Sequence, residues 1–170
     1  MQVYLAGDML SEGQQLRRTY EKERIEELGF KVYNPSDDKS INDKKNAKQD
    51  NLAERIVEND TRGISESHIL VFDYLPHAQG TLTELGYVQA ILREMKRESF
   101  KPPLVFVQCT DIRQGNGHIP TESDRFEFSI NQYVYGVILE VTEGRGIQSF
   151  DEILETLREI KKLNYWRINK

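Results

Sequence analysis

Short apolar runs alternate with longer amphipathic stretches along this chain, and the alternation predicts its fold. Residues 69–74, Ile-Leu-Val-Phe-Asp-Tyr, have the character of a buried parallel strand. The stretch that follows opens with Gly80-Thr81 and predicts a helix to about Arg97, with apolar residues at Leu82, Leu85, Val88 and Ile91. A strand that leads into a helix in this way lies at the carboxyl edge of an α/β sheet, where ligands bind.

The amino-terminal third shows the same alternation. Residues 3–6 predict a buried strand that Gly7-Asp8 ends, and residues 31–33 predict a second strand that ends at Asn34-Pro35. Between them, residues 12–28 predict an amphipathic helix with Gly29 as its stop and with apolar positions at Leu16, Tyr20, Ile25 and Leu28. Strand, helix and strand in this order imply a parallel sheet.

The remaining elements continue the pattern to the carboxyl end. Residues 51–65 predict a helix with Leu52, Ile56, Val57 and Ile64 on one face, residues 104–107 a fourth strand, and residues 126–141 a further helix. Residues 144–148 predict a short fifth strand. Ser149 and Glu152 resemble a capping box that opens a closing helix over residues 153–163. We expect a single α/β domain over residues 1–170.

Two long polar segments, 36–50 and 110–124, follow strands two and four. Polar connections of this length are either functional lids or disordered, and the position of the first at the carboxyl edge of the sheet favours a lid. The second contains His118, which is an acid or base or, the favoured interpretation, a loop residue. In the tail, Trp166 is either a packing anchor or a partner contact.

Composition narrows the class of ligand. Twenty-three basic and 28 acidic residues give a formal charge of −5, which argues against a nucleic-acid polymer and favours small, soluble ligands. The one cysteine, Cys109, excludes a disulfide framework and favours a reducing compartment, with a buried structural thiol preferred over a reactive one. Neither a signal peptide nor a membrane span is visible, so a cytoplasmic location is expected.

Glu84 is the acidic residue that the pattern places nearest the expected ligand site. It lies about one turn into the predicted helix, where the positive end of the helix dipole favours an ionised carboxylate. This position makes it a candidate nucleophile rather than a general acid with a raised pKa. The alternative is a carboxylate that serves only as a dipole partner. Asp60, taken by itself, has the character of a solvated helix residue.

Four groups of residues together resemble the nucleoside 2-deoxyribosyltransferase family. They are Val3-Tyr4-Leu5-Ala6-Gly7, Asn59-Asp60 with Ile64, Gly80-Thr81-x-x-Glu84-Leu85-Gly86-Tyr87, and Ile130-Asn131 with Gly136. They occur in the family's order and spacing over most of the chain. The resemblance implies a flavodoxin-like three-layer sandwich with a five-stranded parallel sheet, and breakage and re-formation of N-glycosidic bonds through a carboxylate nucleophile.

The resemblance also implies a role for each matching residue. Glu84 corresponds to the nucleophile, Tyr4 to the tyrosine that orients it, and Asp60 to the aspartate that handles the base and its proton. Asn131 corresponds to an asparagine that a neighbouring subunit lends to the sugar site. Gly80 and Thr81 would let the backbone approach the sugar. Two successive displacements at the anomeric carbon imply overall retention of configuration.

Two positions depart from the family's pattern. Many members carry an acidic base contact six residues before the glutamate, where this chain has Ala78, so Gln79 or His77 are possible substitutes and the preference for purine or pyrimidine stays open. After Gly7 the chain has Asp8 instead of a Gly-Ser-rich phosphate cradle. An inward-facing Asp8 would repel a 5′-phosphate, which favours nucleosides as substrates.

The resulting hypothesis is an enzyme that transfers a 2-deoxyribosyl group between nucleobases. Its expected site comprises Glu84, Asp60 and Tyr4, with Gly7, Asp8, Gln79, Gly80, Thr81 and Asn131 binding substrate. No metal or organic cofactor is expected, since neither His/Cys ligand spacing nor a Rossmann fingerprint is present. The alternatives are an N-glycoside hydrolase and a non-catalytic nucleotide-binding module. The expected partners are nucleosides and free bases in a homo-oligomer, a dimer or a hexamer of dimers, with Trp166, Tyr133 and Tyr135 as candidate interface aromatics.

Overall fold

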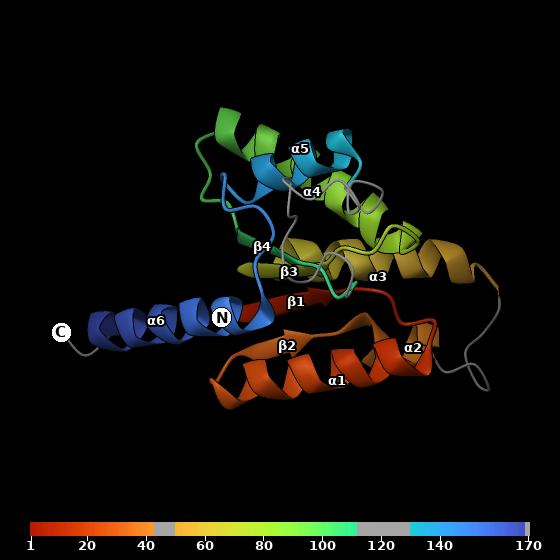
Figure 1. Ribbon diagram of the computed structural model, residues 1–170, viewed down its shortest axis with the longest axis horizontal. Coiled ribbons are helices and arrows are strands. Elements are labelled where there is room, and N and C mark those ends of the chain that lie inside the picture. The colour runs from red at the N-terminus through yellow and green to blue at the C-terminus, as the bar shows by residue number, and fades with distance from the viewer. Residues whose placement is uncertain (43–49, 112–129, 169–170) are drawn as a thin grey trace, which may run out of the picture.

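The sheet is fully parallel, with strand order β2-β1-β3-β4 (Figure 1). The computed structural model describes residues 1–42, 50–111 and 130–168, with side chains as far as Leu163. The strands are β1 Gln2–Ala6, β2 Lys31–Tyr33, β3 Ile69–Asp73 and β4 Leu104–Gln108. The prediction of a fifth strand over residues 144–148 is wrong, because the sheet has four strands within the described residues. That segment forms one parallel bridge, between Val107 and Ile147.

Helices cover both faces of this sheet, which confirms the predicted three-layer α/β arrangement (Figure 1). One face packs on α1 Glu12–Glu27 and α6 Phe150–Ile168. The other packs on α3 Leu52–Glu66, α4 Gln79–Arg97 and α5 Gln132–Val141. Two short elements, the 3₁₀ turn η1 Pro35–Asp37 and helix α2 Lys39–Asn42, connect β2 toward α3.

The alternation of side chains in β1 places its residues on opposite faces. Val3 and Leu5 join the core beneath α1 and α6, whereas Tyr4 and Ala6 join the core beneath α3, α4 and α5. All four are at most 1% exposed. Tyr4 therefore points toward the same layer of helices as the predicted site residues Asp60 and Glu84, which lie on α3 and α4.

Helix α1 has the predicted bounds but not the predicted inner face. Ser11 caps its amino end and Gly29, at φ 79°, follows its carboxyl end, as expected. Leu16 and Tyr20, predicted to point inward, are 65% and 45% exposed, and Arg18 and Glu21 are buried instead. The prediction for Val57 of α3 is wrong in the same way, because its side chain is 62% exposed.

The first polar segment is not a plain loop where it is described. Asn34 caps η1, Ile41 of α2 is buried, and Lys22 of α1 pairs with Asp37 at 2.8 Å. Residues 43–49, which belong to the predicted lid, lie outside the described residues. So do His118 and the start of the helix predicted over residues 126–141, whose described part is α5.

The capping box predicted at Ser149 and Glu152 is confirmed. Glu152 accepts a hydrogen bond from the Ser149 amide at 2.7 Å, and the Glu152 amide donates to Ser149 Oγ at 3.3 Å. Helix α6 extends beyond the predicted end to Ile168, and the Trp166 side chain lies outside the described part. None of the described helices combines the length and the apolar composition that crossing a membrane requires.

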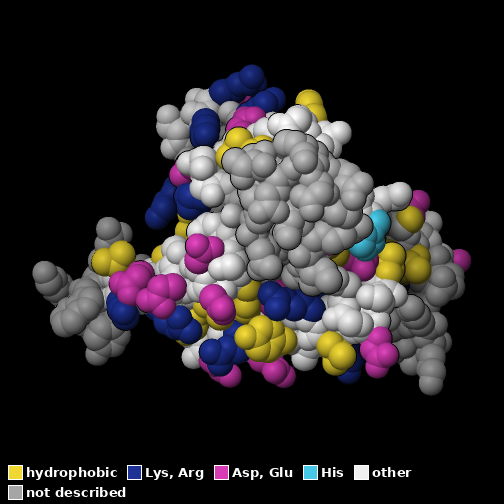
Figure 2. All heavy atoms as spheres, in the orientation of Figure 1, with side chains coloured by type: hydrophobic (Ala, Val, Ile, Leu, Met, Phe, Trp, Pro, Cys, Tyr) yellow, Lys and Arg dark blue, Asp and Glu magenta, His cyan; other side chains and the backbone are white. Residues whose placement is uncertain are grey.

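Charges of both signs mix on the surface formed by α1 and α6. Figure 2 shows acidic and basic side chains interspersed along the lower edge of the molecule, where these helices lie. They include exposed pairs one turn apart, such as Arg24 with Glu27 and Arg158 with Glu155. Exposed pairs of this kind contribute little to stability, about 0 to 1 kcal/mol each.

Candidate functional site

Glu84 of α4 and Tyr4 of β1 meet beneath the carboxyl end of the sheet. The Tyr4 hydroxyl donates to Glu84 Oε1 at 2.9 Å, across 80 residues of sequence. Tyr4 is fully buried, so its ring is held by the core, and Glu84 as a residue is half-buried. The structure thus brings together two of the residues that the sequence predicted for the site.

Two stacked tyrosines and a glycine support this hydrogen bond. The Tyr4 and Tyr33 rings lie 5.6 Å apart between centroids and 11° from parallel. Gly63 of α3 makes room for them, because a Cβ atom there would lie 2.8 Å from Tyr33 Cε1 and 3.1 Å from Tyr4 Cδ2. Sequence analysis missed Tyr33 and Gly63, although a glycine inside an amphipathic helix is a signal of close approach.

Gly63→Ala is expected to lower both stability and activity. The added methyl must displace the tyrosine pair, which costs about 1 to 3 kcal/mol and exceeds the gain in helix propensity of about 1 kcal/mol. Thermal unfolding measures the first effect, and the rate of the catalysed reaction measures the second. Gly13→Ala in α1, where a Cβ atom meets nothing within 4 Å, is the matched control and should unfold at or slightly above the wild-type temperature. An unchanged melting temperature for Gly63→Ala would contradict the crowding seen here.

Asp60 of α3 is the second carboxyl group at this site. Burial, followed by the charge of Asp38, raises the pKa of Asp60 to about 6. Asp60 also contributes to raising the pKa values of Glu84 and Tyr4, which places it close to both. Within the described residues, Asp60 Oδ1 is buried and has no hydrogen-bond partner. The site therefore holds a carboxyl group with an unused polar atom beside Glu84.

The expectation that the helix dipole keeps Glu84 from having a raised pKa is wrong. Helix α4 begins at Gln79, so Glu84 lies beyond the first turn, where the dipole acts most strongly. Burial raises the pKa of Glu84, the hydrogen bond from Tyr4 lowers it, and the charge of Asp60 raises it, and together they bring this pKa to about 7. Glu84 is therefore partly protonated near neutral pH.

Glu84→Gln should make the protein more stable at neutral pH and change how stability depends on pH. The folded protein raises the pKa of Glu84 from 4.5 to about 7, so the stability contribution of this group is complete below pH 4.5 and is lost as the pH rises to about 7. Glutamine does not titrate, so the variant gains up to about 3 kcal/mol over wild type across that window. Urea unfolding at several pH values measures the difference. Glu94→Gln, on the exposed face of α4, is the control and should parallel wild type; a Glu84→Gln curve parallel to wild type would refute the raised pKa.

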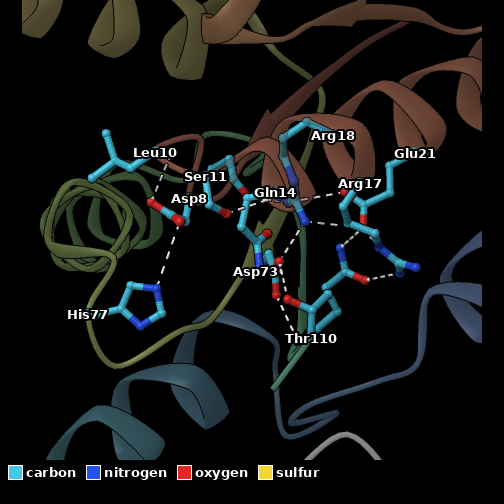
Figure 3. A network of polar contacts seen from close by, with 12 residues as sticks. Asp8, Leu10, Ser11, Gln14, Arg17, Arg18, Glu21, Asp73, His77 and Thr110 are labelled. Carbon is cyan, nitrogen blue, oxygen red and sulfur yellow. Dashed lines mark hydrogen bonds and ion pairs between the residues drawn. The ribbon is translucent and has the colours of Figure 1, made fainter. Parts of the chain in front are cut away.

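The predicted glycine and aspartate after β1 have distinct environments. Gly7 lies against the buried Arg18 side chain, where a Cβ atom would come within 2.2 Å of Nη1, so its small size serves packing. Asp8 is 7% exposed, accepts from the Leu10 amide at 3.3 Å, and has Oδ2 3.8 Å from His77 Nε2 (Figure 3). Asp8 and His77 thus lie together at the carboxyl edge of β1 and β3.

The remaining predicted binding residues lie at the starts of helices. Gln79 and Gly80 are exposed in the first turn of α4, Thr81 is buried beside them, and Ala78 precedes the helix as a buried residue. Asn131 caps α5, where its side chain accepts from the amides of Tyr133 and Val134 and is otherwise exposed. No contact in the described residues joins Asn131 to Glu84 within one subunit.

A buried polar network lies on the opposite face of the sheet and was not predicted. Arg18 of α1 donates to Asp73 at 2.5 Å and to Ala6 O at 3.2 Å, and its guanidinium pairs with Glu21 at 3.0 Å (Figure 3). Asp73 in turn accepts from the Thr110 amide and hydroxyl. The network links the segments that follow β1, β3 and β4.

Two hollows of about 260 and 760 Å³ lie elsewhere. Pro103 and Leu104, at the amino end of β4, line both, and the larger one is also lined by His68 and Ile69 at the amino end of β3. We assign the site to the opposite, carboxyl edge of the sheet, because the neighbouring carboxyl groups of Glu84 and Asp60 and the buried Tyr4 lie there. In the described part of the chain, no three His, Cys, Asp or Glu side chains are grouped so as to hold a metal ion.

Comparison with known proteins places the chain in a family. A family model described as nucleoside 2-deoxyribosyltransferase matches residues 3–147. A conserved protein from Enterococcus faecalis V583 is 22% identical with a TM-score of 0.66, and the match covers 93% of this chain and 97% of the other. A 2-deoxyribosyltransferase from the psychrotolerant bacterium Bacillus psychrosaccharolyticus is 16% identical with a TM-score of 0.57, and the match covers 92% and 96%. Both likenesses concern the fold. No curated protein gives a significant match. Because the family model spans most of its length, the chain belongs to the nucleoside 2-deoxyribosyltransferase family.

Proposed function

We propose that the protein transfers a 2-deoxyribosyl group between nucleobases through a covalent sugar ester on Glu84. One arrangement of residues carries the proposal. The fully buried Tyr4 orients the carboxyl group of Glu84, and a second carboxyl group lies nearby, that of Asp60, whose Oδ1 has no partner among the described residues. Retaining glycoside chemistry needs these parts: a nucleophile on one side of the sugar and a proton donor for the leaving group.

The first step breaks the bond between C1′ and the base nitrogen. Ionised Glu84 attacks C1′ and forms an ester, and Asp60 gives its proton to the departing base. An acceptor base then attacks C1′ from the face that the first base left, the ester bond breaks, and the proton of the acceptor returns to Asp60. Each step inverts C1′, so the product retains the original configuration.

The acidities of the two carboxyl groups set a requirement for the substrate. The pKa of Glu84 is raised to about 7 and that of Asp60 to about 6, so Glu84 holds a proton at least as firmly as Asp60 does. The reaction needs the opposite arrangement, with Glu84 ionised and Asp60 protonated. Positive charge that develops at C1′ favours the ionised form of Glu84. A basic ring nitrogen of the substrate near Asp60 favours a proton shared between that nitrogen and the Asp60 carboxyl group.

Asp8 supports a neutral substrate in preference to a phosphorylated one. Its carboxylate is buried at the carboxyl edge of β1, and the structure places an exposed imidazole, that of His77, beside it. A 5′-phosphate brought to this edge would meet a negative charge in a medium of low dielectric constant. Deoxynucleosides are therefore the proposed substrates, and the buried Ala78 leaves the choice of base to other residues.

Base exchange tests the proposal directly. The protein is incubated with deoxyinosine alone and with adenine added, and further purine and pyrimidine pairs cover an unknown preference. Deoxyadenosine formed only when adenine is present supports transfer. Hypoxanthine released at a rate that ignores adenine identifies an N-glycoside hydrolase instead. Intact-mass analysis after incubation with 2-fluoro-deoxynucleosides decides the third case, since a non-catalytic nucleotide-binding module gains no sugar adduct.

Asn131→Ala should lower the exchange rate less than loss of Glu84 does, and mixed subunits should recover activity. The proposal includes a homo-oligomer in which Asn131 of one subunit reaches the sugar site of another. An oligomer reassembled from Asn131→Ala and Glu84→Ala subunits then contains some sites with both residues intact. Asn131→Ser keeps the helix cap and controls for its loss, which costs about 1 kcal/mol. Mixed oligomers no more active than the two parents would refute sharing between subunits.

A further inference from the structure

The turn that follows β2 brings a carboxylate, Asp38, against helix α3. Its Oδ1 accepts from the amide of Ser40 at 2.9 Å and from the Ser40 hydroxyl at 2.6 Å. Its Oδ2 accepts from Asn59 Nδ2 at 3.0 Å and from the Tyr33 hydroxyl at 3.4 Å. Four neutral donors thus surround Asp38, and both of its oxygens are engaged. The turn is also held to α1 by the ion pair of Lys22 with Asp37.

These donors keep Asp38 ionised. Partial burial raises the pKa of Asp38, but the hydrogen bonds from Ser40, Tyr33 and Asn59 together outweigh burial and lower it below its ordinary value. No cation neutralises the group in the contacts described for it. Arg62, on α3, donates to Asn59 Oδ1 at 2.7 Å and so pairs with the neighbouring amide.

Asp60 is the neighbour on which this negative charge acts. Asn59, which binds Asp38, precedes Asp60 on α3, and Tyr33, which also binds Asp38, stacks on Tyr4. Five titratable groups from different elements act on this cluster. They are Tyr4 of β1, Tyr33 of β2, Arg62 of α3, Glu84 of α4 and Asp38 of the turn. After burial, the charge of Asp38 is the largest cause of the raised pKa of Asp60.

We propose that Asp38 is a positioning residue for Asp60: its fixed negative charge, held beside Asp60 by Asn59 and Tyr33, favours the protonated form of the Asp60 carboxyl group, the form that gives a proton to a leaving nucleobase. The purpose of the proton rests on the proposed function, whereas the effect of Asp38 on Asp60 does not. Ser40, Asn59 and Tyr33 hold the Asp38 carboxylate in place, and its charge acts on Asp60 through space, so the effect requires no contact between Asp38 and the substrate. The turn after β2 is thus an electrostatic part of the site.

The test follows the titration of Asp60 without substrate. Carbon-13 labelling of aspartate side chains and NMR between about pH 4 and 9 give the midpoint, with Asp60→Asn providing the assignment. In Asp38→Asn, which keeps the shape, the Asp60 midpoint should fall by ~0.5 to 1 unit from its wild-type position. Asp37→Asn is the matched control. It removes an adjacent carboxylate of the same turn, one that pairs with Lys22, and should leave the midpoint unchanged.

A second variant keeps the test decisive if Asp38→Asn folds poorly. Asp38→Ser retains an oxygen that can cap the Ser40 amide but carries no charge, so it should lower the Asp60 midpoint as well. A midpoint equal to wild type in a folded, uncharged variant overturns the proposal, as does an equal shift in Asp37→Asn.

Kinetics then connect the titration to the reaction. The alkaline limb of the pH profile for base exchange should move to lower pH by the same amount in Asp38→Asn as the NMR midpoint, and stay in place in Asp37→Asn. A shifted midpoint in a protein that exchanges no bases would refute the proposed function and leave the electrostatic role of Asp38 intact. An unshifted midpoint in an active transferase would refute the role of Asp38 alone.

Discussion

Glu84→Ala is expected to fold and to lose base exchange by at least ~10³-fold. The substitution removes the proposed nucleophile, and no other carboxyl group in the described site takes a hydrogen bond from Tyr4. Alanine is a good helix former, so α4 persists. The loss of a buried carboxyl group offsets the cost of leaving the Tyr4 hydroxyl without its acceptor, about 1 to 3 kcal/mol. Initial rates of exchange between deoxyinosine and adenine measure the effect.

The matched control for this variant is Glu94→Ala. Glu94 lies on the same helix, is exposed, and pairs with Arg97 one turn away, so its loss should change neither the fold nor the exchange rate. Circular dichroism and thermal unfolding of both variants separate catalysis from folding. Exchange by Glu84→Ala at close to the wild-type rate, or a sugar adduct on that variant, would place the chemistry on another residue.

Those residues of the candidate site that belong to a sequence motif could be predicted from the sequence. Residues whose role depends on contacts with distant parts of the chain could not. The resemblance to the family predicts Tyr4, Asp60 and Glu84, and the position of Glu84 near a helix start predicts it as well; the structure joins Tyr4 to Glu84 by a hydrogen bond and places Asp60 close to both. Tyr33 was assigned only to a short strand, because its role depends on stacking against a ring 29 positions earlier in the chain. Asp38 was placed in a polar loop, because the hydrogen bonds that define it come from β2, α3 and its own turn.

Helix α1 shows why an apolar pattern can mislead. Counting apolar residues put Leu16 and Tyr20 inside, and the structure exposes both. The buried positions are Arg18 and Glu21. Arg18 pairs with Asp73 of β3 as well as with Glu21, and Glu21 also pairs with Arg17 on its own helix. A periodicity argument treats charged residues as outward, and that rule fails wherever the strands below supply matching charges.

Those compensating charges form a closed set beneath the carboxyl edge. Arg18 pairs with Asp73 and Glu21, and Glu21 also accepts from Arg17 at 2.5 Å and from Gln108 at 2.7 Å (Figure 3). Arg18 and Glu21 have no exposed surface, and neither does Asp73. Charges this deeply buried are tolerated only in pairs, since removing one partner leaves the other without water or a counter-charge.

Arg18→Met should therefore destabilise the protein strongly, by about 3 to 5 kcal/mol. Methionine fills the space along α1 but removes the ion-pair partner of Asp73, leaves Glu21 paired with Arg17 alone, and removes the hydrogen bond to Ala6 O. Urea unfolding followed by circular dichroism measures the loss. Arg24→Met is the matched control on the same helix, where an exposed pair with Glu27 is broken at a cost of at most about 1 kcal/mol. Combining Arg18→Met with Asp73→Asn should recover part of the loss, because the carboxylate that loses its ion-pair partner is then absent. A loss in Arg18→Met no larger than that in Arg24→Met would mean that water reaches these carboxylates, and the network could not then be what holds the segments after β1, β3 and β4 together.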